Sequence, residues 1–330
     1  MMANQIRIGH LIDGSGGAIQ KNVCLSIAGG RIDSITTATA ESVPARQGDP
    51  SVDLSFAVVV PPFVDCYAHL ALSGTINSNL RRQQGDLDAK ATASLIGRHL
   101  VYLFRHGVLA VQDSDPRWAS VFRERPFAGE PVSVRHFGLD QPTPLVKADG
   151  ATQVKQALVL GCRGIIGGES MGRDNFKRLA DLEITWVPTL FVIKMSEQRA
   201  AAMEPGKQGE KRLDKQMEQV ALAREMGVRV AVGTGAGSRA VLHGEAMVEE
   251  LKLLLKAGYS LSEAVCCATF NGARLLQTET GVISAGMPAT FLVARGTPAQ
   301  LPRKFAYLEA VYIDGTPSPF YRKNPIRGVF

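Results

Sequence analysis

The sequence predicts an α/β fold in which a TIM-type (β/α) barrel is joined to a small β-sandwich domain formed by both termini. Three observations support this. The middle of the chain alternates short apolar runs with amphipathic helical patterns, both ends consist of short strands separated by glycine turns, and 330 residues with 45% hydrophobic content can bury a large core. Alternating strands and helices indicate a parallel sheet with helical crossovers, which at this length often closes into a barrel.

The two ends of the chain carry the pattern of a β domain. The expected strands are Gln5–Ile12, Val23–Ile27, Arg31–Thr36, Thr290–Ala294 and Ala306–Ile313. Gly29-Gly30 and Asp314-Gly315 mark turns, and the polar segment 41–50 is expected to be a loop. We therefore assign residues 1–56 and 284–330 to the β domain and residues 57–283 to the barrel.

The middle of the chain supplies the elements of the barrel. The expected strands are Ala57–Val60, Val108–Gln112, Arg163–Ile166, Thr185–Ile193 and Val228–Val232. The expected helices are Ala89–Arg105, Thr152–Leu160, Asp174–Leu182, Gly209–Glu225, Glu245–Lys256 and Leu261–Leu276. Ser260 followed by Glu263 predicts a capping box at the start of the last helix.

Composition excludes several classes of function. The net charge of +6 is spread along the chain and only 6% of residues are aromatic, so a nucleic-acid surface is not expected. No apolar run is long enough to span a bilayer and the first residues lack a signal-peptide pattern, which predicts a cytoplasmic protein with no membrane partner. Five cysteines without a CxxC pair indicate reduced, mostly buried thiols.

Six ordered segments carry a resemblance to a known family. They are VVVPPFVDCYAHLALSGT at 58–75, GVLAVQDSD at 107–115, WVPTLFVI at 186–193, RVAVGTGAGS at 229–238, the helical stretch 243–276 and GVISAGMPATFLVARG at 281–296. In this order they resemble the first, second, a late and the eighth barrel strand, the two helices that follow, and the return into the β domain of the amidohydrolase superfamily. The resemblance is to the lineage of imidazolonepropionase and the prolidases.

This resemblance implies a metal-dependent hydrolase ancestor. Family members cleave amide-like bonds with one or two divalent metals, usually zinc, bound at the carboxyl ends of the strands. Two histidines come from strand one and two more from strands five and six, while a lysine on strand four often bridges the metals. An aspartate after strand eight binds metal and accepts a proton from the water. The metal lowers the pKa of that water and polarises the scissile carbonyl.

Several of these ligands are absent from the matching positions. Tyr67 stands at the first strand-one histidine and His69 at the second, while Gly235 stands at the aspartate. The middle fits two registers: residues 144–161 on strand five with Asp149 at the ligand and Gly167 at the strand-six histidine, or residues 161–169 on strand four with Ile166 at the lysine. The chain is also shorter here than the family pattern. One or two β/α units can therefore be absent or reduced, and a shortened or distorted barrel is an alternative to a complete one.

The histidine count limits any replacement site. The six histidines are His10, His69, His99, His106, His136 and His243. No register brings four of them together, and no HExxH or paired-cysteine site occurs. We therefore predict no metal ligands and no cofactor, with zinc or another divalent metal present only if altered hydrolytic chemistry survives.

Four residues are the catalytic candidates. His69 is either a surviving ligand, a substrate hydrogen-bonding group or a structural histidine, and Tyr67 is either a general acid or a ring that fills the vacated metal space. Lys147 and Asp149 lie two positions apart, so on a strand they face the same side. They form either an acid–base or anion-binding pair or an exposed ion pair on a loop.

Two further residues are candidates for binding a substrate. His243 opens a helix after the eighth strand, where it either borders the pocket or packs at the start of the helix. Glu169 follows Gly167-Gly168 near a strand end.

The sequence thus predicts an amidohydrolase-like protein with a dismantled metal site. We expect a pseudoenzyme, a non-hydrolytic protein that either binds a small molecule or serves as a structural or partner subunit, with an active relative among its possible protein partners, and that can form a homo-oligomer. The alternative is an enzyme of altered chemistry, either a C–N hydrolase with an atypical metal site or a metal-independent acid–base lyase or isomerase.

Overall fold

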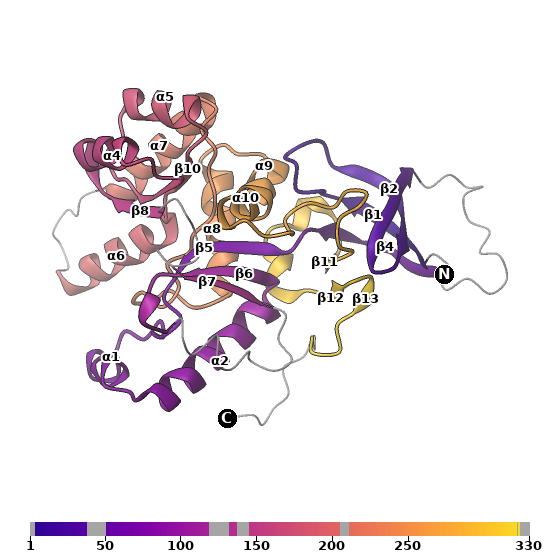
Figure 1. Cartoon of the computed structure of the whole chain (residues 1–330), viewed down its shortest axis with the longest axis horizontal. Helices are drawn as coiled ribbons and strands as arrows, with labels where there is room; N and C mark the ends of the chain where they lie inside the picture. Colours follow the sequence, from indigo (N-terminus) through magenta and orange to yellow (C-terminus); the bar gives the residue numbers. More distant parts are fainter. Residues whose placement is uncertain are drawn as a thin grey trace.

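A computed structural model describes residues 4–37, 51–118, 132–136, 145–204, 211–321 and 323. The strands from the two ends of the chain lie together at one end of the molecule, and the remaining strands and helices form the larger part (Figure 1). The predicted α/β fold with a β domain built from both termini is confirmed. The predicted loop at 41–50 lies outside the described residues.

The β domain contains one seven-stranded sheet with the order β13-β12-β11-β4-β1-β2-β3. Its strands are β1 (Asn4–Leu11), β2 (Gln20–Ala28), β3 (Arg31–Thr37), β4 (Ser51–Val60), β11 (Phe291–Arg295), β12 (Ala310–Ile313) and β13 (Thr316–Pro317). Residues 57–60, which the sequence analysis placed with the barrel, pair with β11 in this sheet. The predicted strand Ala306–Ile313 starts only at Ala310, because Arg303–Tyr307 forms the 3-10 helix η3.

The barrel strands form two parallel three-stranded sheets that residues 230–236, the closing segment, connect. One sheet contains β5 (Phe63–Ala68), β6 (Val108–Asp113) and β7 (Ser133–His136), and the other contains β8 (Leu145–Ala148), β9 (Gly164–Gly167) and β10 (Thr185–Val187). In the closing segment, Val230 forms an isolated parallel β-bridge with Trp186, and Ala236 forms one with Ala68. The predicted strand Val228–Val232 therefore contributes an isolated bridge rather than a continuous ladder.

The order of the strands selects one of the two registers. If the closing segment is the eighth strand, β10, β9 and β8 are the seventh, sixth and fifth, because each pairs with the next. Only the eight residues 137–144 separate β7 from β8. A parallel crossover needs a dozen or more residues, so this connection is too short for a further β/α unit, and the described residues supply six barrel strands and the closing segment.

Helices cover the barrel strands (Figure 1). They are α1 (Ser78–Gly85), α2 (Ala89–Arg105), α4 (Gly150–Val159), α5 (Arg173–Asp181), α6 (Leu190–Met203), α7 (Arg212–Glu225), α8 (Glu245–Lys256), α9 (Leu261–Ala268) and α10 (Phe270–Leu276). Two short 3-10 helices, η1 (Pro116–Trp118) and η2 (Pro298–Gln300), lie in loops. None of the described helices is both long and apolar enough to cross a membrane.

Two predicted elements were wrong in extent. The strand predicted at Thr185–Ile193 ends at Val187, because α6 starts at Leu190. The helix predicted at Leu261–Leu276 breaks at Thr269, where the carbonyl of Cys267 accepts from the Val232 amide of the closing segment instead of continuing the helix. The capping box at its start is confirmed.

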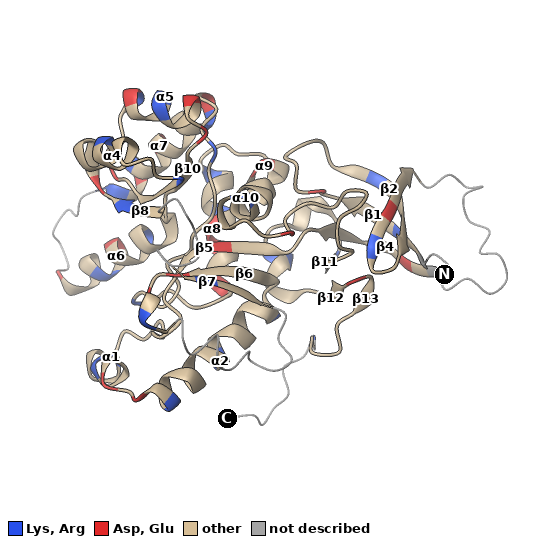
Figure 2. Cartoon of the chain, in the orientation of Figure 1, with Lys and Arg blue, Asp and Glu red and all other residues tan. Residues whose placement is uncertain are grey.

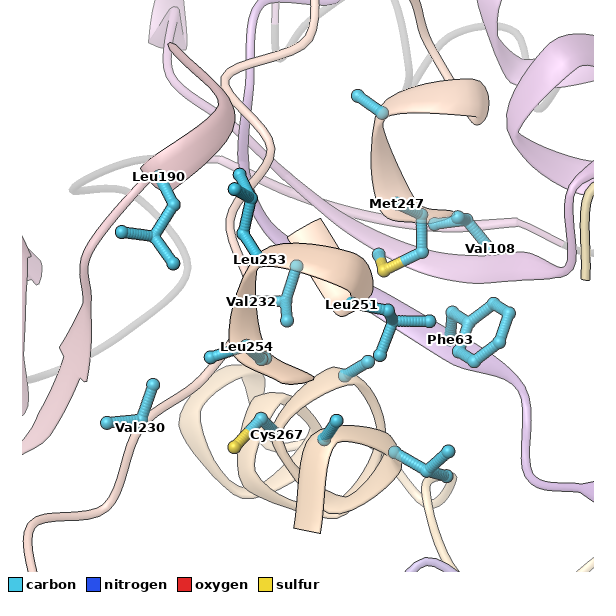
Figure 3. Close-up of a cluster of buried hydrophobic side chains, with 14 of the residues drawn as sticks. Phe63, Val108, Leu190, Val230, Val232, Met247, Leu251, Leu253, Leu254 and Cys267 are labelled. Carbon is cyan, nitrogen blue, oxygen red and sulfur yellow. The ribbon is translucent and has the colours of Figure 1, made fainter. Parts of the chain in front are cut away.

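The core lies on both faces of the barrel strands. Figure 3 shows Met247, Leu251 and Leu254 of α8 among side chains of the strands and of neighbouring helices. A second cluster takes one or two residues from nearly every strand: Val64, Cys66, Ala110, Leu145, Ile166, Val187 and Ala231. Because these residues pack together from five strands and the closing segment, they define the inner face of the barrel.

Candidate functional site

The carboxyl ends of β5, β6 and β8 bring five side chains together, which we call the strand-end cluster: Tyr67, His69, Ser114, Lys147 and Asp149. Leu145 packs on the inner face of the barrel. Side chains alternate along a strand, so Lys147 shares that face two positions later. Lys147 and Asp149 are exposed, whereas Tyr67 and His69 are half-buried.

His69 is held in its neutral form by its surroundings. Its Nδ1 lies 2.5 Å from Ser114 Oγ, and its ring meets the Tyr67 ring edge-on at 5.1 Å. Burial, together with the positive charges of Arg81 and Lys147 and against the opposing charge of Asp115, lowers the pKa of His69 to about 4. A neutral imidazole can accept or donate one hydrogen bond, but it does not bring a positive charge near pH 7.

Tyr67 lies against the closing segment. A Cβ atom added to Gly233 would come within 2.9 Å of the Tyr67 Cβ. Burial raises the pKa of the Tyr67 phenol, and the negative charge of Asp149 raises it further, so the hydroxyl stays protonated at neutral pH. The ring thus occupies part of the space beside the last strand and presents a neutral hydroxyl.

Asp65 joins β5 to the closing segment behind the cluster. Its Oδ1 accepts hydrogen bonds from the amides of Tyr67 at 3.2 Å and Thr234 at 2.9 Å, while its Oδ2 accepts from Thr234 Oγ1 at 2.5 Å. The side chain is completely buried and burial raises its pKa to about 6. This carboxyl group therefore fixes the backbone that carries Tyr67, and it does not reach the strand-end cluster.

Basic side chains surround His69. Arg81 Nη1 donates to the carbonyls of Ser73 at 3.1 Å and Gly237 at 2.9 Å, and Gly237 packs against His69. Arg239 Nη1 donates to Ser78 Oγ at 3.1 Å. Burial lowers the pKa of Arg81, and the nearby charges of Arg239 and Arg199 lower it further.

Within the described residues, no carboxylate forms an ion pair with Arg81, Arg239 or Lys147. The nearby Asp115 is already paired with Arg117 through a 2.9 Å bond to Nε. Elsewhere acidic and basic residues are interspersed along the chain (Figure 2). The excess of positive charge around His69 is therefore a local feature.

Two predicted binding residues make their contacts elsewhere. Glu169 accepts from Arg212 of α7, with Nε 2.8 Å from Oε2, so its charge is compensated within the protein. His243 is buried, stacks on His99 with 3.9 Å between ring centroids, and places its Nε2 3.3 Å from the His69 carbonyl. It supports the backbone of His69 from behind. A role for either residue in binding a ligand stays a prediction.

Sequence reasoning missed two residues of this region. Ser114 sits one position beyond β6, and no local pattern pairs it with His69. Arg81 follows the strand-one segment and has no motif around it, so its proximity to His69 is visible only in the fold.

The side chains at the family's ligand positions do not fit a zinc site. Gly235 has φ +60°, and a Cβ there would lie 2.3 Å from Val192 Cγ2. Gly167 has φ +85°, and its Cβ would lie 2.7 Å from Asp149 Oδ1, which itself accepts from the Gly168 amide at 3.1 Å. Among the residues that the structure describes, no three His, Cys, Asp or Glu side chains are grouped to hold an ion. We therefore derive no step through a metal.

Comparison with known proteins assigns the chain to a family. The sequence model described as "Amidohydrolase family" matches residues 153–321, which is more than half of the 330 residues. The chain belongs to the amidohydrolase family. Searched against curated proteins, it matches none.

Solved structures share the fold of this amidohydrolase-family protein. A Xaa-Pro dipeptidase with bound methionine in its active site is 17% identical, with a TM-score of 0.75 over 96% of this chain and 99% of that one. The A. niger ochratoxinase is 15% identical, with a TM-score of 0.74 over 96% of this chain and 95% of that one. A molinate hydrolase is 14% identical, with a TM-score of 0.74 over 97% and 95% of the two chains. At these identities the likeness concerns the fold.

Proposed function

We propose that this amidohydrolase-family protein binds a small anionic molecule at the strand-end cluster and does not hydrolyse it with a metal-activated water. The observation that carries the proposal is the backbone at Gly235. The left-handed φ and the Val192 methyl group leave no room for a side chain at the position where the family has its aspartate. The packing around this position, as well as the residue itself, therefore disfavours a ligand side chain here.

The other donors support the same conclusion. A catalytic zinc ordinarily has three protein ligands and one open position. His69 is the one histidine in the strand-end cluster, and its Nδ1 is bonded to Ser114. Tyr67 and Gly167 stand at two other histidine positions, so the cluster supplies too few nitrogen donors. No described strand stands at the position of the fourth, which carries the bridging lysine in the family.

The charges around His69 indicate the kind of ligand. The charges of Arg81 and Lys147 act on the neutral imidazole, and Arg239 lies near Arg81; no described carboxylate forms an ion pair with these three. Lys147 is exposed, while Arg81 and Arg239 are half-buried and also donate to protein acceptors. Cations without a paired carboxylate attract anions, and guanidinium groups bind carboxylate or phosphate through paired hydrogen bonds. A carboxylate or phosphate group on a small molecule matches this arrangement.

Isothermal titration with small carboxylates and phosphorylated compounds tests the binding. We expect Lys147→Gln to weaken the best ligand about tenfold, which is about 1.4 kcal/mol, while Lys155→Gln leaves it unchanged. Lys155 is an exposed lysine of α4 and controls for the loss of one positive charge. Equal effects of the two variants would contradict the proposed location.

Elemental analysis of protein purified without chelator, with and without added zinc, tests the metal. We expect less than about a tenth of an equivalent, because a catalytic zinc needs three protein ligands. A stoichiometric metal that is lost in His69→Ala, together with cleavage of Xaa-Pro dipeptides, would overturn the proposal. Binding of a protein partner or an active relative stays a prediction.

One observation favours the alternative of altered chemistry. A neutral His69 is hydrogen-bonded through its Nδ1 to the Ser114 hydroxyl, which is the pairing of a general base with the group it activates. Metal-independent acid–base chemistry would then use His69 and Tyr67. Turnover of a carboxylate ligand that persists with chelator and disappears in Ser114→Ala would establish this alternative.

A further inference from the structure

A cleft of about 500 Å³ lies between the barrel and the β domain. The first residues of β6 and β7, the loop that follows α10, and the start and end of the return into the β domain form its walls. It is located at the amino-terminal ends of β6 and β7, opposite the strand-end cluster. Cavities of this volume at domain boundaries are common places for small ligands.

The wall of the cleft is rich in hydroxyl groups around one guanidinium. Ser133, Thr278, Thr280 and Thr290 contribute hydroxyl groups, and Gln277 contributes an amide. Leu109, Ala110, Val282, Pro288 and Ile313 form the apolar part. Among the described residues that line the cleft, Arg135 is the one basic side chain.

Arg135 makes one hydrogen bond within the described part of the protein, and its other side-chain donors have no described acceptor. Its Nε donates a long hydrogen bond of 3.4 Å to the carbonyl of Leu276, at the end of α10. No described residue accepts from its Nη atoms. The acid at the cleft, Glu279, is 83% exposed in its side chain and lies 3.8 Å from Arg31 rather than against Arg135. The half-buried guanidinium therefore has donors to offer to a ligand.

We propose that this interdomain cleft binds a small carboxylate that carries hydroxyl or amide groups, with Arg135 paired to the carboxylate. A guanidinium offers two parallel N–H donors to a carboxylate, and the surrounding hydroxyl groups match polar substituents on the same molecule. The apolar wall takes up a short carbon chain.

The end of α10 limits the charge of the ligand. Backbone carbonyls at the carboxyl end of a helix carry partial negative charge, and here Arg135 and Arg163 both donate to them. The cleft therefore offers one guanidinium to a ligand, with the Glu279 carboxylate at its wall turned toward Arg31. A single carboxylate fits this balance better than a phosphate dianion.

Arg163 provides a matched control for Arg135. Both arginines donate to carbonyls of the last residues of α10, but only Arg135 lines the cleft. Arg135→Gln removes one such contact and Arg163→Gln removes two, each with one positive charge, so a purely structural effect should be at least as large in Arg163→Gln. A difference in binding isolates the role of Arg135 in the cleft.

The experiment titrates the full chain with L-malate, L-lactate, L-glutamine, inorganic phosphate and glycerol, and follows binding by calorimetry and ligand-observed NMR. We expect at least one of the three carboxylates to bind more tightly than phosphate or glycerol. Arg135→Gln should weaken it at least tenfold, while Arg163→Gln and Lys147→Gln leave it unchanged. A carboxylate bound at the strand-end cluster would instead be weakened by Lys147→Gln and unaffected by Arg135→Gln, so these two variants assign each bound ligand to one site and either proposal can fail alone.

Three results would overturn the inference. They are no binding of any of the carboxylates at millimolar concentration, an equal loss in Arg163→Gln, or tighter binding of phosphate that persists in Arg135→Gln. If Arg135→Gln does not fold, as judged by its circular dichroism and melting curve, Thr280→Val is the second variant. It removes one hydroxyl group of the wall at nearly constant volume, and unchanged carboxylate binding in it would also contradict the proposal.

Discussion

Replacing Gly235 by aspartate returns the side chain of the family pattern to its position, and we expect it to destabilise the protein. A non-glycine residue at φ +60° costs about 1–2 kcal/mol. The new Cβ would lie 2.3 Å from Val192 Cγ2, and overpacking of this kind costs about 1–3 kcal/mol. Since a β-branched side chain has few alternative rotamers, Val192 must shift with its backbone. Together these effects predict a loss of about 2–5 kcal/mol in the free energy of unfolding.

Equilibrium unfolding in urea measures this loss. Gly235→Ala should show most of it, because the Cβ and not the carboxylate causes the clash. Combining Gly235→Ala with Val192→Ala should recover about 1 kcal/mol relative to the sum of the single variants, since the two residues are in contact. A change below about 0.5 kcal/mol in Gly235→Asp, together with about one equivalent of bound zinc, would refute the reasoning, because the space would then accept a working ligand.

Three further predictions concern other buried groups. Burial raises the pKa of Glu250 to about 8, above its unfolded value, so the folded state binds this proton more tightly. The resulting contribution to the free energy of unfolding is complete below about pH 4.5 and declines as the pH rises toward 8. Glu250→Gln should flatten this decline in a series of urea unfolding curves from about pH 5 to 8. The His69 imidazole should titrate near pH 4 by NMR, and a midpoint near 6.5 would show that burial and the nearby cations do not act on it. Leu251→Ala should cost about 2–5 kcal/mol in thermal or urea unfolding while Leu251→Met costs less than about 1.5, because Leu251 is fully buried.

The fold was predictable where the pattern is local. The alternation of apolar runs and helices gave the barrel, and the capping box at Ser260 gave the start of α9 to the residue. The apolar run 185–193 has no clear period, so the point where β10 gives way to α6 was not visible. The start of α6 is held by Glu250, 59 residues beyond Phe191, whose carboxyl Oε1 accepts from the Phe191 amide at 2.7 Å. Such tertiary contacts leave no mark in the local sequence.

The candidate site was predictable to the same extent. Alternation along a strand places Lys147 and Asp149 on one face, and the family pattern placed Tyr67 and His69 together. The contribution of Arg81 depends on its bond to the Gly237 carbonyl, which joins segments more than 150 residues apart. The choice between the two registers likewise needed the observed pairing of β8 with β9, because residues 144–169 match the family pattern equally well in both registers.

The proposal that this protein has lost its metal site rests on three changes with different physical causes. At Tyr67 a ring packs beside the closing segment, at Gly235 a left-handed backbone meets Val192, and between β7 and β8 the connection is too short for another β/α unit. A single reversion can address one of these changes and leaves the others in place. Restoring a histidine at position 67 supplies a second nitrogen donor, but the aspartate at 235 still meets the Val192 methyl group. Zinc affinity should therefore stay low in each single variant, and only a redesign of the loop that carries Gly235 together with position 67 should raise it.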